Sequence, residues 1–332
     1  MQVSQPPSPS EVGSQTIPIL EFSVTAPSVS APRALAGVLS VFQTPFHADE
    51  SIDFGTLEKE IAWLYDRGAN GIVMAMVSEV LRLSSQERDE LAERACRLGR
   101  GRGVVVISVG AESSHTAERY ARHAEHVGAD AVMAVPPIAV ALGEEQLLAY
   151  YRRILEAIDI PVIVQDASGY VGRPMSIVLQ ARLLDEFGQR VLFKPEAVPI
   201  GPRLSELHAA TGGRARVFEG TGGIALVDSF RRGVVGTMPG ADLIDGIVAI
   251  WRALNAGDET RATRVWLPLA ALVSLQHSLD AFLAVEKYLL VKQGIFANTI
   301  VRGPVGYVLD EPTRREVDRL FELLMAEVRT IQ

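Results

Sequence analysis

The chain has little cysteine: Cys96 is the single thiol among 332 residues. One thiol rules out an intrachain disulfide and fits a reducing compartment. Cys96 shares an apolar helical face with Leu91, Ala95 and Leu98, so we interpret it as a small core residue. The start of the chain also lacks the basic and apolar pattern of a secretory signal and the arginines of a transit peptide. These absences predict a cytoplasmic protein.

The sequence also lacks long apolar runs and basic stripes. No apolar run reaches the roughly 18 residues that a membrane-spanning helix needs. The formal net charge is −8, and charges of both signs are interspersed along the chain. This distribution argues against nucleic acid and anionic membranes as partners. We therefore expect a small molecule to be the partner.

Motifs for several common chemistries are absent as well. The chain has no Walker loop, no nucleophile elbow and no zinc signature. His123 and His126 stand three residues apart with His115 before them, but no carboxylate triad accompanies them. We interpret these histidines as surface residues and predict neither a metal site nor a cofactor.

What the sequence does contain is a regular alternation that begins near Gly37. Apolar, β-branched segments at about 37–43, 71–76, 103–109, 130–135, 161–165, 191–194, 216–219 and 234–238 alternate with segments of helical periodicity. Eight such pairs without an antiparallel strand favour an α/β fold, a closed (βα)8 TIM barrel, over an open doubly wound sheet. Three more helices are expected at about 260–275, 279–293 and 312–331. The predicted organisation is a flexible extension over 1–33, a barrel over 34–256 and a helical subdomain over 257–332.

One lysine is expected at the end of the barrel that carries the active site in this fold. Lys194 ends the sixth apolar segment and is followed by Pro195, which biases it toward an extended backbone. The carboxyl ends of barrel strands carry the active site, and an amine buried there can be held neutral and attack a ketone. The alternative is a strand-end lysine that reaches solvent. Glu196 lies two residues further on and would share the face of Lys194.

Other polar residues follow the expected strands. Asp166, Glu196 and Glu219 are candidate bases, although each could be a solvated carboxylate or a helix cap. Gly220 to Gly223 could bind an anion at the start of a helix, or could simply form a tight turn.

At these residues the chain resembles the dihydrodipicolinate synthase / N-acetylneuraminate lyase superfamily of class I aldolases. The resemblance covers about 36–327 and rests on Thr44-Pro45-Phe46, LSSQER at 83–88, GADA at 128–131, Lys194 and GVVG at 233–236. It implies a Schiff base between Lys194 and a 2-oxo acid, often pyruvate, without a cofactor. It also implies a homotetramer, or at least a homodimer.

The chain departs from the family's pattern at three hydroxyl positions. The loop at 76–79 is one residue shorter and keeps only Ser78, Gln165-Asp166 replaces a tyrosine–asparagine pair, and Ile138 replaces an interface tyrosine. Tyr170 lies five residues beyond Gln165. The glutamate that usually follows the lysine is replaced by Pro195, with Glu196 one position on. These departures argue against dihydrodipicolinate synthesis.

We therefore predict a Schiff-base lyase, an aldolase or hydro-lyase, that acts on pyruvate or a sugar-derived keto acid. The predicted catalytic residues are Lys194, Gln165, Asp166 and Glu196, and the predicted substrate-binding residues are Thr44, Ser78, Glu79, Gly220, Thr221, Gly222 and Thr237. A non-catalytic descendant that binds a small acid is the alternative. A phosphosugar enzyme is a third hypothesis, but it would need basic residues near the glycine turn.

Overall fold

The computed structural model describes residues 1–2, 34–169 and 172–330. The chain divides into two units between residues 32 and 33, and the account below concerns the described residues of the second. Apart from its first two residues, the predicted extension over 1–33 lies outside the described residues. The predicted division at residue 256 stays a prediction.

Parallel strands make up the centre of the described unit. The sheet order is β6-β5-β4-β3-β2-β1-β8-β7, and a bridge between Phe193 and Val217 joins its two outer strands. This closure confirms the predicted barrel. Its strands are β1 (Gly37–Val41), β2 (Gly71–Val73), β3 (Val104–Ser108), β4 (Ala131–Ala134), β5 (Val162–Asp166), β6 (Val191–Pro195), β7 (Phe218–Glu219) and β8 (Gly236–Thr237).

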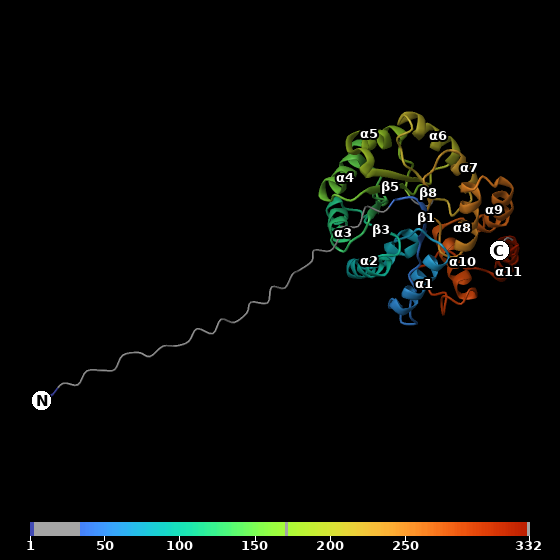
Figure 1. Cartoon of the computed structure of the whole chain (residues 1–332), viewed down its shortest axis with the longest axis horizontal. Coiled ribbons are helices and arrows are strands. Elements are labelled where there is room, and N and C mark those ends of the chain that lie inside the picture. The colour runs from blue at the N-terminus through green and yellow to red at the C-terminus, as the bar shows by residue number, and fades with distance from the viewer. Residues whose placement is uncertain (3–33, 170–171, 331–332) are drawn as a thin grey trace. The chain divides into compact units, whose positions relative to one another are not determined.

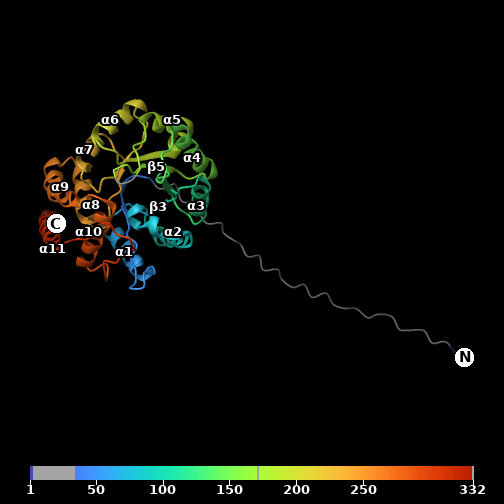
Figure 2. The same ribbon diagram turned by 180° about the vertical axis from the view of Figure 1, so that it is seen from behind.

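Helices surround the strands and continue beyond the barrel (Figures 1 and 2). The barrel helices are α1 (Phe54–Asp66), α2 (Ser85–Gly99), α3 (Ser114–His126), α4 (Glu144–Ala157), α5 (Ile177–Phe187), α6 (Ile200–Ala210), α7 (Leu226–Arg231) and α8 (Ile244–Asn255). The predicted C-terminal helices are present as α9 (Glu259–Val273), α10 (Leu279–Lys292) and α11 (Glu311–Arg329). Of the helices in the described ranges, none has both the length and the apolar character to cross a bilayer.

Local sequence signals account for several helix starts. A capping box begins α2, where the Ser84 side chain accepts from the backbone N–H of Glu87 and the Glu87 side chain accepts from that of Ser84. The helix expected to begin near Gly223 begins instead at Leu226. The reason is the backbone before it: φ is +70° at Gly222 and +98° at Gly223, outside the right-handed helical region.

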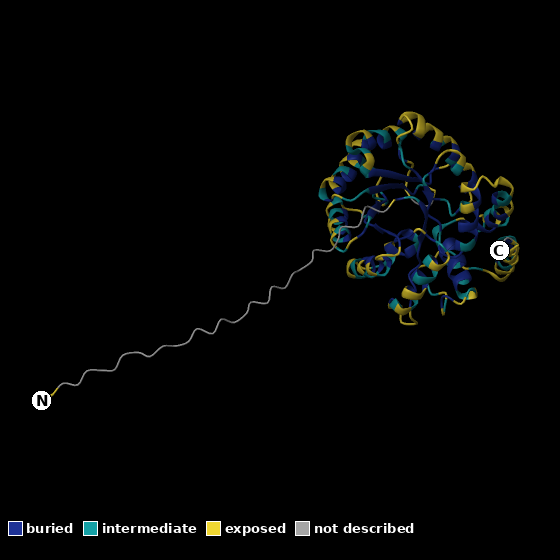
Figure 3. Ribbon diagram, viewed as in Figure 1, coloured by how far each residue is buried: buried dark blue, intermediate teal, exposed yellow. Residues whose placement is uncertain are grey.

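The strands bury both of their faces, which explains why their sequences are apolar throughout. One buried cluster fills the barrel interior and includes Leu39, Val106 and Phe218, while a larger one lies between the strands and the helices. Figure 3 shows the buried strands at the centre and exposed residues on the outer helix faces. The interior is therefore a packed core that supports the residues at the strand ends.

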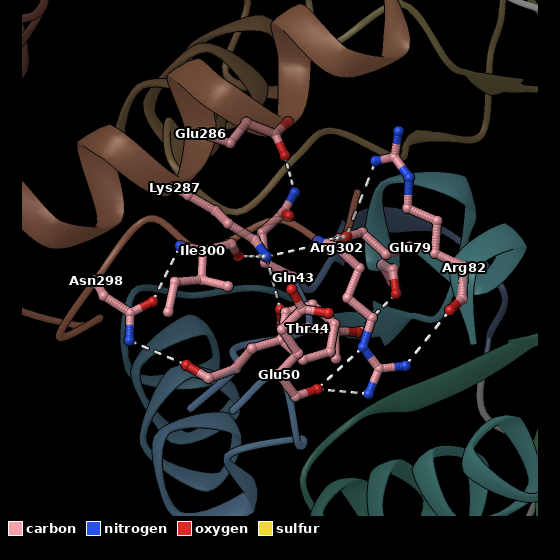
Figure 4. Close-up of polar contacts among 12 residues, drawn as sticks. Gln43, Thr44, Glu50, Glu79, Arg82, Glu286, Lys287, Asn298, Ile300 and Arg302 are labelled. Atoms are coloured by element: carbon pink, nitrogen blue, oxygen red, sulfur yellow. Dashed lines mark hydrogen bonds and ion pairs between the residues drawn. The ribbon is translucent and has the colours of Figure 1, made fainter. Parts of the chain in front are cut away.

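A buried lysine attaches α10 to the barrel (Figure 4). The Lys287 ammonium donates to the backbone oxygens of Thr44 (2.9 Å) and Ile300 (2.6 Å), and it is paired with Glu79. Burial lowers the pKa of Lys287, and the charge of Glu79 opposes that effect. Glu79 itself has a positive φ of 58°. Its backbone is therefore in the left-handed region, where a side chain needs strong contacts to hold it.

We predict that Lys287→Met destabilises the protein by about 3 to 5 kcal/mol, because it removes the nearest cation of the buried Glu79 carboxylate and leaves it only the more distant Arg82. Urea unfolding gives the free energy, and adding Glu79→Gln should recover part of the loss. Lys292→Met, on the same helix but exposed and paired with Asp318, is the matched control and should cost less than about 1 kcal/mol. Equal effects at 287 and 292 would contradict the prediction.

Candidate active site

Lys194 lies at the carboxyl end of β6, inside the barrel mouth. It pairs in register with Gln165 of β5 and is only 4% exposed. The extended backbone continues past Pro195, since the backbone N–H of Glu196 donates to the oxygen of Asp166 (2.9 Å). Lys194 and Glu196 therefore point toward the same side.

Glu196 joins Lys194 and Gln165 in one buried contact group. Its Oε1 is paired with the Lys194 ammonium and accepts from Nε2 of Gln165 (2.8 Å). The other carboxyl oxygen, Oε2, has no hydrogen-bond partner among the described residues. Burial raises the pKa of Glu196, and the nearby Lys194 partly opposes the rise. The site thus holds a carboxyl that can exchange a proton with the lysine and still offers an unused oxygen.

A glycine gives the lysine its space. A Cβ placed on Gly220, in the turn after β7, would lie 2.9 Å from Cγ of Lys194 and 3.1 Å from Cγ of Glu196. A real side chain at this position would therefore displace the lysine or the glutamate. Gly220 is part of the site because it leaves this volume free.

The three polar groups face a pocket of about 430 Å³, counted with its open mouth. Apolar residues from β1, the loop after β2 and α10 complete the wall. The lining residues are Val41, Ala75, Met76, Val77, Gln165, Lys194, Glu196, Gly220, Gly222, Met238, Gly240, Leu279, Phe282 and Glu286. Of the predicted site residues, the structure brings together Lys194, Gln165, Glu196, Gly220 and Gly222.

The loop after β2 places two backbone donors at the pocket. Met76 and Val77 line it at the start of the short turn η1 (Met76–Ser78), and their N–H groups have no acceptor among the described residues. The first N–H groups of a helical turn are free to bind an anion such as a carboxylate.

Three residues predicted to bind substrate stabilise this loop instead of lining the pocket. Ser78 donates to the backbone oxygen of Phe42 (2.5 Å), and Thr44 donates to that of Ser78 (2.6 Å). Glu79 is paired with Lys287. These side chains do not line the pocket, and their contacts hold the loop that does.

Asp166 and the two threonines are also engaged elsewhere. Asp166 accepts from the backbone of Ser168 (3.1 Å) and Met175 (3.0 Å), so its carboxyl organises the connection between β5 and α5. The hydroxyl of Thr237 donates to Glu219 (2.6 Å), which also accepts from the backbone N–H of Thr221 (2.7 Å). None of these side chains lines the pocket. Tyr170 lies outside the described residues.

Sequence reasoning missed Glu286, which reaches the pocket from α10. Its Oε2 accepts from Nε2 of Gln43, whose backbone N–H donates to Glu60 (2.8 Å). Burial raises the pKa of Glu60 and Glu286 well above the usual range, and burial raises the pKa of Asp242 to about 7. Three carboxyls therefore lie buried beside the barrel mouth, where burial favours the neutral form of each.

A signal for these acids exists in the helical periodicity. Glu286 stands four residues after Phe282 and four before Leu290, and Glu60 stands three after Leu57 and four before Leu64. Each acid therefore occupies an apolar stripe, where a charged residue is unusual.

The remaining predicted features concern Cys96 and metal binding. Cys96 is buried, and burial raises the pKa of its thiol to about 12, which fits a core residue. Within the described ranges, no group of three or more His, Cys, Asp or Glu residues is placed to hold a metal ion.

Comparisons with known proteins agree with the fold. The model of the dihydrodipicolinate synthetase family matches residues 34–323. The L-2-keto-3-deoxyarabonate dehydratase of Azospirillum brasilense is 29% identical over 87% of this chain and 94% of its own length. An uncharacterized DapA-like lyase of Pyrococcus abyssi is 27% identical over 83% of this chain and 93% of its own. The crystal structure of dihydrodipicolinate synthase from Rhodopseudomonas palustris, at 26% identity, superposes with a TM-score of 0.80 over 87% of this chain and 97% of that one.

The buried acids predict a specific pH dependence of stability. The pKa of Asp242 is about 7 in the folded state, above its ordinary value of 3.8. Its contribution is therefore fully present below about pH 4 and is lost as the pH rises to about 7, because the unfolded chain ionises first. Asp242→Asn should make the fall in unfolding free energy between about pH 5 and 7 smaller by on the order of 2 kcal/mol.

Urea unfolding of both proteins at the two pH values measures this difference. Glu322→Gln removes an exposed carboxylate and serves as the control. Glu322→Gln should lose stability with rising pH as steeply as the unmodified chain. The interpretation fails if Asp242→Asn does so too.

Proposed function

The chain belongs to the dihydrodipicolinate synthetase family, and from that membership we propose that it is a Schiff-base-forming lyase of 2-oxo acids. The observation that carries the proposal is Lys194, buried at the end of β6 and facing a pocket together with Glu196 and Gln165. Its amine attacks the C2 carbonyl of the substrate and forms an imine once water leaves. The protonated imine draws electrons from C3, so no cofactor is required.

The pocket supports binding of the acid end of such a substrate. Among its described lining residues, Lys194 is the single basic one. A substrate carboxylate next to C2 would be received by the N–H groups of Met76 and Val77. Thr44, Ser78 and Glu79 contribute indirectly, because they fix that loop.

Glu196 is the proton carrier that the contacts favour. It touches the amine, and burial raises its pKa, so it can give a proton to the departing water of the carbinolamine and then remove one from C3. Gln165 exchanges no protons in this range, but its amide fixes Oε1 of Glu196. Asp166 is a weaker candidate, because backbone N–H groups already occupy its carboxyl.

Within the lyases, we propose a hydro-lyase that acts on a 3-deoxy-2-oxo sugar acid. The dehydratase of Azospirillum brasilense supports this choice. The far wall of the pocket, with Leu279 and Phe282, offers no cation to a second carboxylate or a phosphate. A short, uncharged tail fits this wall, whereas a phosphosugar does not. Removal of a proton from C3 and loss of the hydroxyl on C4 would release one water.

The proposal also covers the cellular location and the oligomeric state of the enzyme. We propose a cytoplasmic homotetramer or homodimer, as the family resemblance implies. The rival function, a non-catalytic protein that binds a small acid, would keep binding but show neither an adduct nor turnover, and the following experiment separates the two.

Borohydride reduction in the presence of pyruvate, or of a longer 2-oxo acid, should attach the acid covalently to Lys194. The chain has four lysines, so peptide mass mapping identifies the labelled one without ambiguity. Lys194→Met should abolish labelling and turnover, whereas Lys59→Met, at an exposed lysine, should change neither. Failure of every 2-oxo acid tested to form an adduct would refute the proposal.

Glu196→Gln should uncouple imine formation from proton removal. In D2O the unmodified enzyme should exchange the C3 protons of pyruvate through the enamine, and the variant should do so about 10² to 10⁴ times more slowly. Proton NMR follows the exchange, and borohydride labelling of the same variant reports whether the imine still forms. An unchanged exchange rate would exclude Glu196 as the base.

A further inference from the structure

Glu286 lines the pocket, but the proposed imine formation and carboxylate binding give it no role. It lies on α10, is 1% exposed, and lines the same pocket as Lys194 and Glu196. Its carboxyl lies against Gly240, where a Cβ would overlap with Oε1. Because Gly240, just after β8, has no side chain, the Glu286 carboxyl fits beside it at the barrel mouth.

The contacts of Glu286 leave one oxygen available. Oε2 accepts from the amide of Gln43 (Figure 4). The backbone N–H of Gln43 in turn donates to Glu60. Oε1 has no hydrogen-bond partner in the part of the chain that the structure describes. An acid whose Oε2 accepts from an amide carries its own proton on Oε1, the oxygen beside Gly240.

The surroundings keep this acid protonated. Burial raises the pKa of Glu286, and the nearby carboxyls of Asp242 and Glu60 raise it further, whereas Gln43 and Lys287 lower it by less. The ammonium of Lys287 is directed to Glu79 and two backbone oxygens, so it does not neutralise Glu286 by a direct contact. Glu286 is thus a proton donor rather than a binding site for a cation.

Different elements bring these groups to one pocket. Gln165 and Lys194 come from β5 and β6, and Glu196 follows β6. Glu286 comes from α10, and Gly240 follows β8, where it bridges to Val41 of β1. A substrate tethered through C2 to Lys194 would therefore occupy a pocket that Glu286 also lines.

We propose that Glu286 is the general acid that protonates the hydroxyl leaving from C4 of the substrate. The inference rests on the proposed Schiff-base function and adds the residue that makes it a dehydration. Glu196 takes the C3 proton, the electron pair moves into the enamine, and its return breaks the C4–O bond. The hydroxyl leaves as water with the proton of Glu286, which becomes a carboxylate. The other product is an α,β-unsaturated imine, so atoms and charges balance.

The test compares two leaving groups. The probes are 4,5-dihydroxy-2-oxopentanoate and its analogue with fluorine at C4, since fluoride leaves without needing a proton from an acid. Glu286→Gln should slow loss of the hydroxyl about 10² to 10⁴-fold and leave loss of fluoride within a few-fold of the unmodified enzyme. A purely structural role would slow both eliminations equally, which would overturn the proposal.

Matched controls separate this proposal from the one it rests on. Glu322→Gln changes an exposed carboxyl that neither lines the pocket nor contacts the group around Glu286, so it should leave both eliminations unchanged. Borohydride labelling of Lys194 in Glu286→Gln should persist. If the unmodified enzyme forms no adduct, the Schiff-base function fails; if it labels and dehydrates and Glu286→Gln dehydrates equally well, only the role of Glu286 fails.

A measurement on the unmodified enzyme covers the case in which the variant does not fold. Loss of the hydroxyl should decline at alkaline pH, where the acid ionises, relative to loss of fluoride. Identical pH profiles for the two probes would overturn the proposal.

Discussion

At the carboxyl end of the barrel, several charged side chains are buried away from water, and the rest of the structure must compensate for their lost hydration. A charge removed from water must be paired, hydrogen-bonded or neutralised. Each of these solutions is present: Lys287 is paired with Glu79, Lys194 shares a hydrogen bond with Glu196, and Glu286 lies beside other buried acids. The same desolvation that would penalise the fold produces groups that can exchange protons near neutral pH.

Consecutive residues of α10 connect the frame with the site. Lys287 attaches the helix to the loops after β1 and β2, while Glu286 reaches the pocket. The loop after β2 is held by Thr44, Ser78 and Glu79, and it presents its backbone to the same pocket. Residues predicted to bind substrate thus support the site from behind, a role that residue type alone does not distinguish from direct contact.

The sequence predicts the fold well because hydrophobic periodicity is local. Eight strand–helix pairs and the C-terminal helices follow from spacing alone, and the main error, the start of α7, arises from positive φ angles at two glycines. Lys194 and Glu196 were predictable because they lie two residues apart, at the end of one strand and just beyond it. Glu286 was not predicted, because its partner Gln43 is 243 residues away in the chain. Asp166 could not be separated from Glu196 either, since its hydrogen bonds depend on the path of a loop.

The position of Glu286 and Lys287 also has an evolutionary consequence. Both belong to a helix that an eightfold barrel does not require for closure. A shortened ancestor ending after α8 would have kept Lys194, but it would have lacked the buried Lys287 and the Glu286 carboxyl that lines the pocket. Deletions after α8 would thus spare Lys194 and its neighbours on the barrel while removing one wall of their pocket.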